Sequence, residues 1–134
     1  MKKPRTRKEF DVQKEVCAFI ADTYPHLVFF SDLSGVRLPI GLAKKIKELK
    51  GRRGIPDIFI AYPSHGLHGL FLELKKEGTV IYKKDGTLRK DSHLEEQEYI
   101  LNVLSNIGYR AEFAIGTMEA ITKILSYVEG DQPS

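Results

Sequence analysis

Residues 54–78 have the sequence GIPDIFIAYPSHGLHGLFLELKKEG, and this stretch decides the fold. Two runs of β-branched, aromatic and leucine residues flank a loop of Pro, Ser, His and Gly, which is typical of a β-hairpin. We expect antiparallel strands over residues 57–62 and 69–75. The start of the first strand then lies beside the end of the second.

Charged residues stand at these two strand ends, where packed residues are expected. Asp57 opens the first strand, and Glu73 and Lys75 close the second. Residues two apart on a strand share a face, so Glu73 and Lys75 point the same way. The register must place Asp57 opposite residue 73 or 75, because a slip of one residue would send its side chain to the other face. Pro56 favours a strand start here, since it lacks an amide donor.

This arrangement predicts a metal site. Two carboxylates that converge at the end of a sheet repel each other, and burying them without a partner is unfavourable. Mg²⁺ prefers oxygen ligands, binds through one or two carboxylates, and leaves positions open for a phosphate. Bound by Asp57 and Glu73, it can polarise a phosphodiester and lower the pKa of a water molecule, while Lys75 orients the water or neutralises developing charge. The pattern therefore predicts phosphodiester hydrolysis. The alternative is a surface ion pair between Glu73 and Lys75, with Asp57 as a turn residue.

Composition limits the class of protein. At 134 residues, with 42% hydrophobic and 29% charged residues, the chain has the length and balance of one globular domain. It contains no apolar run of transmembrane length and no signal-peptide pattern, so we expect a cytoplasmic protein without a membrane partner. The single cysteine, Cys17, fits a reducing compartment. We assign residues 1–130 to one domain, with a basic arm at 1–6 and a disordered tail at 130–134.

Positive charge is concentrated in parts of the chain, although the net charge is only +3. Lysines and arginines crowd the first nine residues, precede Gly54, and recur after Glu73. Such a distribution suits a phosphate backbone. The alternative is that these residues only form solvated faces and a frayed terminus. The candidate DNA-binding residues are Lys44, Lys45, Lys47, Arg52, Arg53, Lys76, Lys83 and Lys84.

Periodicity and turn residues place the other elements. We expect helices over residues 7–23, 39–50, 92–107 and 118–128, and further strands over 26–31 and 109–116. Thr6 and Ser92 each stand three residues before a glutamate, as in a capping box, and Asp85-Gly86 predicts a tight turn. Strands that alternate with helices predict an α/β fold in which a mixed sheet is flanked by helices.

Two polar residues interrupt apolar helix stripes. Glu15 lies among Val12, Val16 and Phe19 of the first helix, and Gln97 breaks a leucine face of the third. A buried polar group needs a partner, and a metal–phosphate site under both helices would supply one. Alternatively, both residues lie at stripe edges and reach solvent.

The ordered set Gly54-Ile55-Pro56-Asp57, Glu73-Leu74-Lys75 and Gln97, with Glu15 on an N-terminal helix, resembles the VRR-NUC family. This family is a branch of the PD-(D/E)xK nuclease superfamily. The likeness runs from about residue 10 to 120, and it is to the small stand-alone form of phages and bacteria. It implies a restriction-endonuclease-like core, with a mixed sheet of about four strands, and a DNA endonuclease that depends on Mg²⁺ or Mn²⁺.

The resemblance also implies a set of metal ligands. Asp57 and Glu73 would bind the metal, with the carbonyl of Leu74 as a further ligand. Glu15 would complete the site directly or through water.

Lys75 and Gln97 also receive roles from the resemblance. Lys75 would be the catalytic lysine, and Gln97 would support the site from its helix. Stand-alone relatives are similar to Holliday-junction resolvases, which implies a homodimer that acts on branched DNA. A basic helical insertion at 38–53 and the hairpin at 79–90 are departures that can alter substrate choice. Two alternatives stay open: a branched-DNA-binding module without catalysis, and a single-strand or RNA nuclease with the same site.

Overall fold

The computed structural model describes residues 8–32, 39–49 and 54–130. The basic arm at 1–6, Arg52, Arg53 and residues 131–134 of the expected tail lie outside this part of the chain. Each helix and strand expected above has a counterpart within it, with ends shifted by up to three residues. The elements in order are α1 (Glu9–Thr23), β1 (Phe29–Ser31), α2 (Ile40–Leu49), β2 (Ile58–Ile60), β3 (Leu70–Lys75), α3 (Ser92–Asn106), β4 (Arg110–Ile115) and α4 (Thr117–Glu129).

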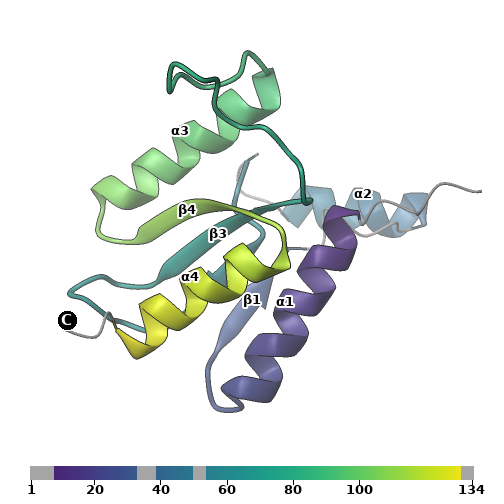
Figure 1. Cartoon of the computed structure of the whole chain (residues 1–134). Helices are drawn as coiled ribbons and strands as arrows, with labels where there is room; N and C mark the ends of the chain where they lie inside the picture. Colours follow the sequence, from purple (N-terminus) through teal and green to yellow (C-terminus); the bar gives the residue numbers. More distant parts are fainter. Residues whose placement is uncertain (1–7, 33–38, 50–53, 131–134) are drawn as a thin grey trace, which may run out of the picture.

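The strands form one mixed sheet in the order β1-β2-β3-β4 (Figure 1). β1 and β3 both pair antiparallel with β2, so the expected hairpin is present. β4 pairs parallel with β3, because α3 carries the chain back across the sheet between them. β3 is therefore an inner strand, and β1 and β4 form the edges.

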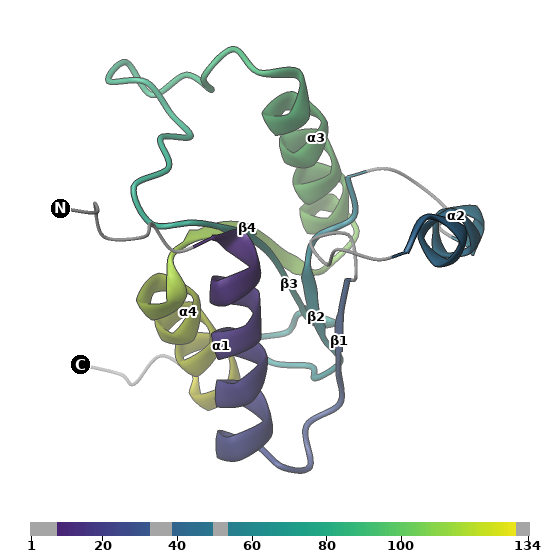
Figure 2. The same cartoon turned by 90° about the vertical axis from the view of Figure 1, so that its right-hand side faces the viewer.

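The sheet separates two hydrophobic clusters. α1 and α4 lie on one face and α3 lies on the other (Figure 2). The cluster under α1 and α4 contains Val12, Val16, Ile20, Ile58, Ile60, Leu70, Leu72, Leu74, Ala114, Ala120, Ile124 and Tyr127. The smaller cluster under α3 contains Ile81, Leu94, Leu101 and Phe113. Because side chains alternate along β3, Phe71, Glu73 and Lys75 lie on the α3 face.

Asp91, and not Ser92, caps the N-terminus of α3. Its Oδ1 accepts hydrogen bonds from the amides of His93 and Leu94 at 2.9 and 3.2 Å. The prediction of a capping box at Ser92 was therefore wrong by one position. Asp and Ser are both good capping residues, but the N-cap residue has an extended backbone, and that residue is Asp91. The Thr6 pattern lies outside the described residues. α1 instead starts after Lys8, whose amide donates to Asp11 Oδ2 at 3.0 Å.

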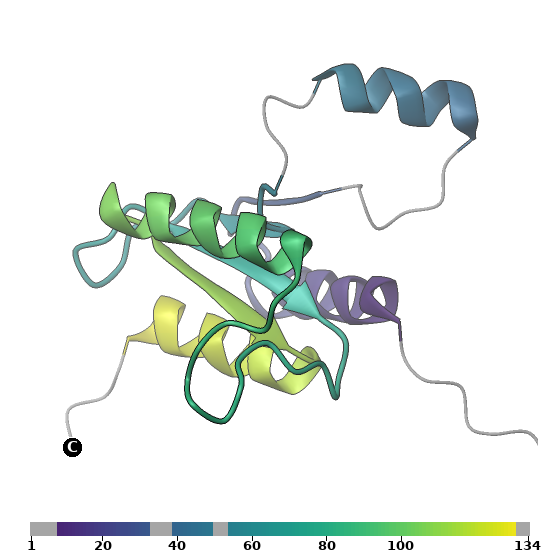
Figure 3. The ribbon, with the colours of Figure 1, turned by 90° about the horizontal axis from the view of Figure 1, so that it is seen from above.

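α2 is the helix that the sequence predicts as a basic insertion. Figure 3 shows it apart from the sheet, and none of its residues is buried. Its lysines are exposed, and so are Ile40 and Leu49, which are 90% and 85% exposed. α2 therefore presents both charged and apolar side chains to its surroundings.

None of the helices in the described residues has the length and apolar character needed to cross a membrane.

Candidate active site at the start of β2 and the end of β3

The β2–β3 hairpin brings the carboxyl groups of Asp57 and Glu73 together. Ile58 pairs with Leu72 in the antiparallel ladder, so the register continued by one residue places Asp57 opposite Glu73. The Asp57 amide donates to Glu73 Oε2 at 3.2 Å, and the Leu74 amide donates to Asp57 Oδ2 at 2.8 Å. The register condition that the sequence sets for Asp57 is met.

Gly54 shapes the entry of the chain into β2. Its φ of 82° lies in the left-handed region, which favours glycine. A Cβ at this position would lie 3.3 Å from side-chain carbons of both Glu96 and Ile100, so glycine also lets α3 pack closely. Pro56 follows and is buried. This start of β2 explains why Gly54 and Pro56 precede Asp57.

Glu73 is buried, with only 5% of its surface exposed. Burial above all, and then the neighbouring Asp57, raise the pKa of Glu73 to about 9, although the charge of Lys75 acts in the opposite direction. Near pH 7 the Glu73 carboxyl therefore keeps its proton. A cation bound between Glu73 and Asp57 would take the place of that proton.

Burial likewise raises the pKa of Asp57. Its hydrogen bonds with Glu73 and with the Leu74 amide oppose this shift, and the charges of Glu9 and Asp32 add to it. Sequence reasoning missed both of these acids. Asp32 follows β1, and its amide donates to the Asp57 carbonyl at 2.7 Å. Extending the β1–β2 register by one residue would have found Asp32.

Lys75 lies beside this pair and lines a polar cleft of about 380 Å³. Its side chain is on the same face of β3 as Glu73, and it is only 8% exposed. The burial of both residues contradicts the alternative of a surface ion pair. The other residues around the cleft come from α1, α3 and the segment between β3 and α3: Glu9, Lys76, Thr79, Arg89, Asp91, His93, Leu94 and Gln97.

Gln97 contacts the pair from α3. Its Nε2 donates a hydrogen bond to Glu73 Oε1, so the polar break in the leucine stripe has the buried partner expected of it. Its Oε1 is buried and has no hydrogen-bond partner among the described residues. A buried acceptor of this kind is unfavourable unless a donor approaches it. A water molecule bound to a metal at Glu73 would be such a donor.

Glu15 is half-buried on α1 and is not among the residues that line the cleft. Glu9 lines it instead. Glu9 lies four residues before Gln13 and seven before Val16, so it shares the helix face that packs on the sheet. Helical spacing therefore marks Glu9, although it lies outside the apolar stripe of Val12, Val16 and Phe19 that contains Glu15.

The donor set fits a small divalent cation with few protein ligands. Within residues 8–32, 39–49 and 54–130, no group of three or more His, Cys, Asp or Glu side chains lies close enough to hold a metal ion. Glu15, Asp57 and Glu73 therefore form no three-acid cluster. Mg²⁺ is commonly held by one or two carboxylates, with water and substrate oxygens in its other positions. The adjacent carboxyls of Asp57 and Glu73, and a Gln97 Oε1 without a partner among the described residues, match that pattern.

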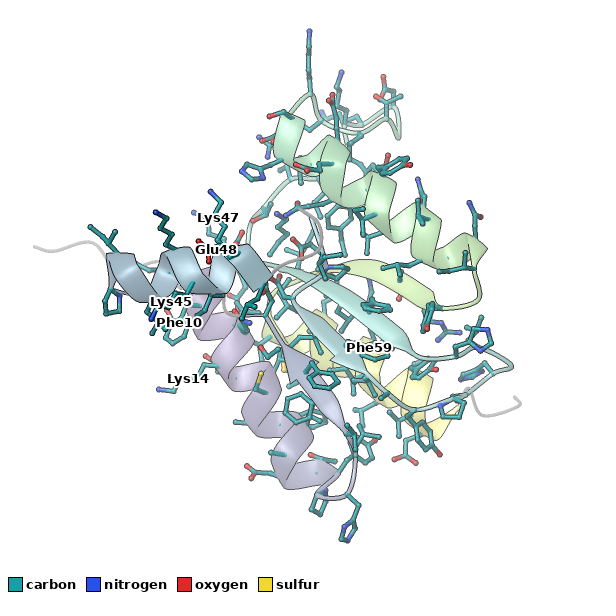
Figure 4. The ribbon with its side chains drawn as sticks, turned by 180° about the vertical axis from the view of Figure 1, so that it is seen from behind. Phe10, Lys14, Lys45, Lys47, Glu48 and Phe59 are labelled. Atoms are coloured by element: carbon teal, nitrogen blue, oxygen red, sulfur yellow. The ribbon has the colours of Figure 1, made fainter. Side chains whose placement is uncertain are left out.

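The candidate DNA-binding lysines occupy two separate regions. Lys44, Lys45 and Lys47 are exposed on α2. Figure 4 shows Lys45, Lys47 and Phe59 from the same side of the molecule. Lys76, Lys83 and Lys84 are exposed in the segment between β3 and α3. Of these six lysines, only Lys76 lines the cleft.

The fold has a counterpart among solved structures. A protein described as a VRR_NUC domain protein is 22% identical in sequence, with a TM-score of 0.64, over 94% of this chain and 92% of that chain. No family model matches the sequence, and no curated protein matches it. The α/β fold predicted from the sequence is confirmed, and the mixed four-stranded sheet flanked by helices is consistent with a restriction-endonuclease-like core. The chain therefore shares the fold of a VRR_NUC domain protein over nearly its whole length.

Proposed function

We propose that this chain is a metal-dependent endonuclease that hydrolyses phosphodiester bonds in DNA, with branched DNA as its substrate. The observation that carries the proposal is the pair of half-buried Asp57 and buried Glu73, with the buried Lys75 beside it on the same face. Two adjacent carboxyls whose pKa values are raised by burial are unfavourable for stability and are typical of a functional site. The likeness to a VRR_NUC domain protein supports the nuclease class.

Asp57 and Glu73 would hold Mg²⁺ or Mn²⁺, and the Leu74 carbonyl would be a further ligand. When bound, the ion supplies Lewis-acid activation of the phosphate and a water molecule of lowered pKa. Glu9 at the cleft edge is better placed than Glu15 to act through water, because Glu9 lines the cleft.

The other residues of the site orient the substrate and the water. Lys75 lines the cleft, where its ammonium would neutralise charge that develops on the phosphate or orient the attacking water. Gln97 holds Glu73 in place through Nε2, and its Oε1, without a partner among the described residues, is free to accept a hydrogen bond from a metal-bound water. The burial of Glu73 and Lys75 strengthens these electrostatic interactions.

Branched DNA and a homodimer are the finer parts of the proposal. They rest on the resemblance of Asp57, Glu73, Lys75 and Gln97 to the stand-alone VRR-NUC pattern. Symmetry supports them, since one site cuts one strand and a four-way junction has a two-fold axis that a C2 dimer can match. The exposed lysines of α2 offer a surface for the phosphate backbone.

A substrate panel tests the proposal. Purified protein is incubated with labelled linear duplex, four-way junction, single-stranded DNA and RNA, each with Mg²⁺, with Mn²⁺ or with EDTA. We expect cleavage of DNA with either metal and none in EDTA, with the junction cut fastest. Binding of the junction without cleavage under any condition would favour the alternative of a DNA-binding module without catalysis. Preferential cleavage of RNA would favour the alternative of a single-strand or RNA nuclease.

The chain supplies its own control for the site. Glu48 and Lys50 repeat the Glu-x-Lys spacing on and just after α2, and Glu48 is exposed. We expect Glu73→Gln to abolish cleavage and Glu48→Gln to leave it unchanged. Equal rates for the two variants would remove Glu73 from the active site.

A further inference from the structure

An aromatic row crosses the sheet on the same face as Asp57 and Glu73. Phe30 on β1 pairs with Phe59 on β2, and Phe59 pairs with Phe71 on β3. Paired residues share a face of the sheet, so the three rings form one line across three strands. We call Phe30, Phe59 and Phe71 the aromatic row.

The rings of the row are ordered by mutual contacts. The Phe30 and Phe59 rings are parallel to within 2°, with centroids 6.3 Å apart, and those of Phe59 and Phe71 stack at 4.4 Å. Tyr109 packs edge-on against Phe71 at 5.1 Å. Gly69 makes room for the central ring, because a Cβ at this position would lie 2.9 Å from a Phe59 ring carbon. The central ring is thus held in place before any partner arrives.

One end of the row is open to solvent. Phe30 is 64% exposed, and Phe59 is only half-buried. α2 does not cover the row, since none of the residues of α2 is buried. Figure 4 shows Phe59 on the strand next to β1, and α3 does not cover this part of the sheet. An exposed phenylalanine that continues into a row of rings gives a partner an apolar surface to cover.

The row is continuous with the candidate active site. Phe59 lies two residues after Asp57, and Phe71 lies two residues before Glu73, on the same face of each strand. Two residues along a strand span about 7 Å. A nucleic-acid strand with a phosphate at Asp57 and Glu73 therefore has adjacent nucleotides within reach of the rings.

We infer that the aromatic row binds unpaired nucleobases of a DNA strand whose phosphate lies at the neighbouring carboxylate pair. This inference rests on the proposed function and narrows it, because it gives the substrate a single-stranded segment. Bases stack on aromatic side chains whatever their sequence, since every base has a π-face. Paired bases inside a duplex do not offer that face.

The charge of the surroundings fits this occupant. Lys45 and Lys47 lie on α2, on the same side of the molecule as Phe59 (Figure 4). A single strand needs rings for its bases and cations for its phosphates, and both features are presented on one side of the molecule. A purely apolar partner would gain nothing from the exposed lysines of α2.

A tryptophan at the open end of the row provides a direct probe. The chain contains no tryptophan, so the indole introduced by Phe30→Trp is its only one. We expect oligo(dT) in EDTA to quench this fluorescence at concentrations where a blunt duplex does not. The control is Met118→Trp on α4, on the opposite face and 72% exposed in the native chain, which we expect to stay unquenched. Equal quenching by both DNAs, or in both variants, would overturn the inference.

Loss of the ring tests the same point by affinity. We expect Phe30→Ala to weaken binding of oligo(dT) about fivefold or more in an anisotropy titration, because one stacked base is lost. Binding of a blunt duplex should change less than twofold, and Met118→Ala should change neither. Phe30→Tyr, which keeps the ring, should bind oligo(dT) like the native chain. An equal loss on both DNAs would show a general effect on fold or charge and would overturn the inference.

The outcomes separate this inference from the proposed function. If the native chain cuts no DNA but the two titrations give the expected results, the nuclease proposal fails and the aromatic row stands. If it cuts DNA and Phe30→Ala changes neither affinity nor quenching, only the inference fails. If Phe30→Ala instead converts a dimer to a monomer in sedimentation, with oligo(dT) affinity unchanged, the row is a contact between two copies and the inference is wrong.

Discussion

The amide of Asp57 donates a hydrogen bond to Glu73 Oε2 at 3.2 Å, and the two carboxyl groups lie on one face of the sheet. Burial disfavours the charge of each, and Asp57 further disfavours the charge of Glu73, whereas the hydrogen bond with Glu73 favours the charged form of Asp57. The pair is stable either with a proton or with a cation between its oxygens. Protons and metal ions therefore compete for the same place, and this competition links pH, metal binding and folding stability.

The metal-free protein should lose stability as the pH rises from about 5 to about 9. The pKa of Glu73 is raised from 4.5 to about 9 in the folded chain, so the unfolded chain binds fewer protons over this window. The stabilisation is fully present below pH 4.5 and is lost as the pH passes the folded value, at up to about 1.4 kcal/mol per pH unit for one proton. Urea denaturation in EDTA at a series of pH values measures this loss. The control Glu73→Gln stays neutral and should give a flatter profile; parallel profiles would contradict the assignment.

Mg²⁺ or Mn²⁺ should bind more tightly as the pH rises from 6 to 9, because the ion displaces the Glu73 proton. Calorimetry in buffers of different ionisation enthalpy should show close to one proton released per ion near pH 7. Bound metal should also raise the melting temperature, and more so at pH 9 than at pH 6. The exposed Glu48→Gln substitution should leave both results unchanged. Metal affinity that does not vary with pH would argue against a site at Glu73.

Lys75→Met should abolish most cleavage and leave metal binding in place. Methionine keeps much of the buried stem but loses the ammonium, which we place at the reacting phosphate. A fall in kcat of about 100-fold or more is expected, with metal affinity by calorimetry reduced less than threefold. Lys14→Met, at an exposed position of α1, is the control. Native kcat in the Lys75 variant would show that the ammonium takes no part in the reaction.

Gln97→Leu should weaken metal binding by about 10- to 100-fold, as expected when a residue that orients a ligand is removed. The folding stability of this variant in EDTA should fall much less than its metal affinity. Leucine also removes the buried Oε1, which has no partner among the described residues. Metal titration and urea denaturation on the same preparation separate the two effects. A large loss of stability with native metal affinity would make Gln97 a purely structural residue.

Replacing Lys44, Lys45 and Lys47 with alanine should weaken DNA binding at low salt. The slope of log K against log salt should fall by up to about 2.7 on duplex DNA if all three contact phosphates. Anisotropy titrations over a range of salt concentrations measure this slope. Fold stability should be unaffected, because all three side chains are exposed. An unchanged slope would show that α2 faces away from the DNA.

Much of the site follows from the hairpin alone. Pro56 and Asp57 mark one strand end and Glu73 and Lys75 the other, and side-chain alternation then requires the register that the structure has. Gln97 was also predictable, because a polar residue in a leucine stripe needs a buried partner, and Glu73 is that partner.

The other features depend on how separate elements meet in space. Glu9 and Asp32 influence Asp57 from α1 and from the end of β1, and although helix spacing and strand register mark their faces, their approach to Asp57 depends on how α1 and β1 meet β2. Asp91 and Ser92 are both good capping residues, so local sequence could not decide between them. The row of Phe30, Phe59 and Phe71 arises only when three strands align.

The position of β3 inside the sheet has a consequence for motion. Its backbone is bonded on both sides, so amides such as Leu72 should be among the last to exchange with deuterium, whereas β1 at the margin should open first. Glu73 and Lys75 thus lie on the strand that is expected to open most slowly, whereas Phe30 lies on an edge strand that is expected to open locally. The proposed catalytic residues would therefore stay fixed, while the edge strand β1 could adapt to DNA of varied shape.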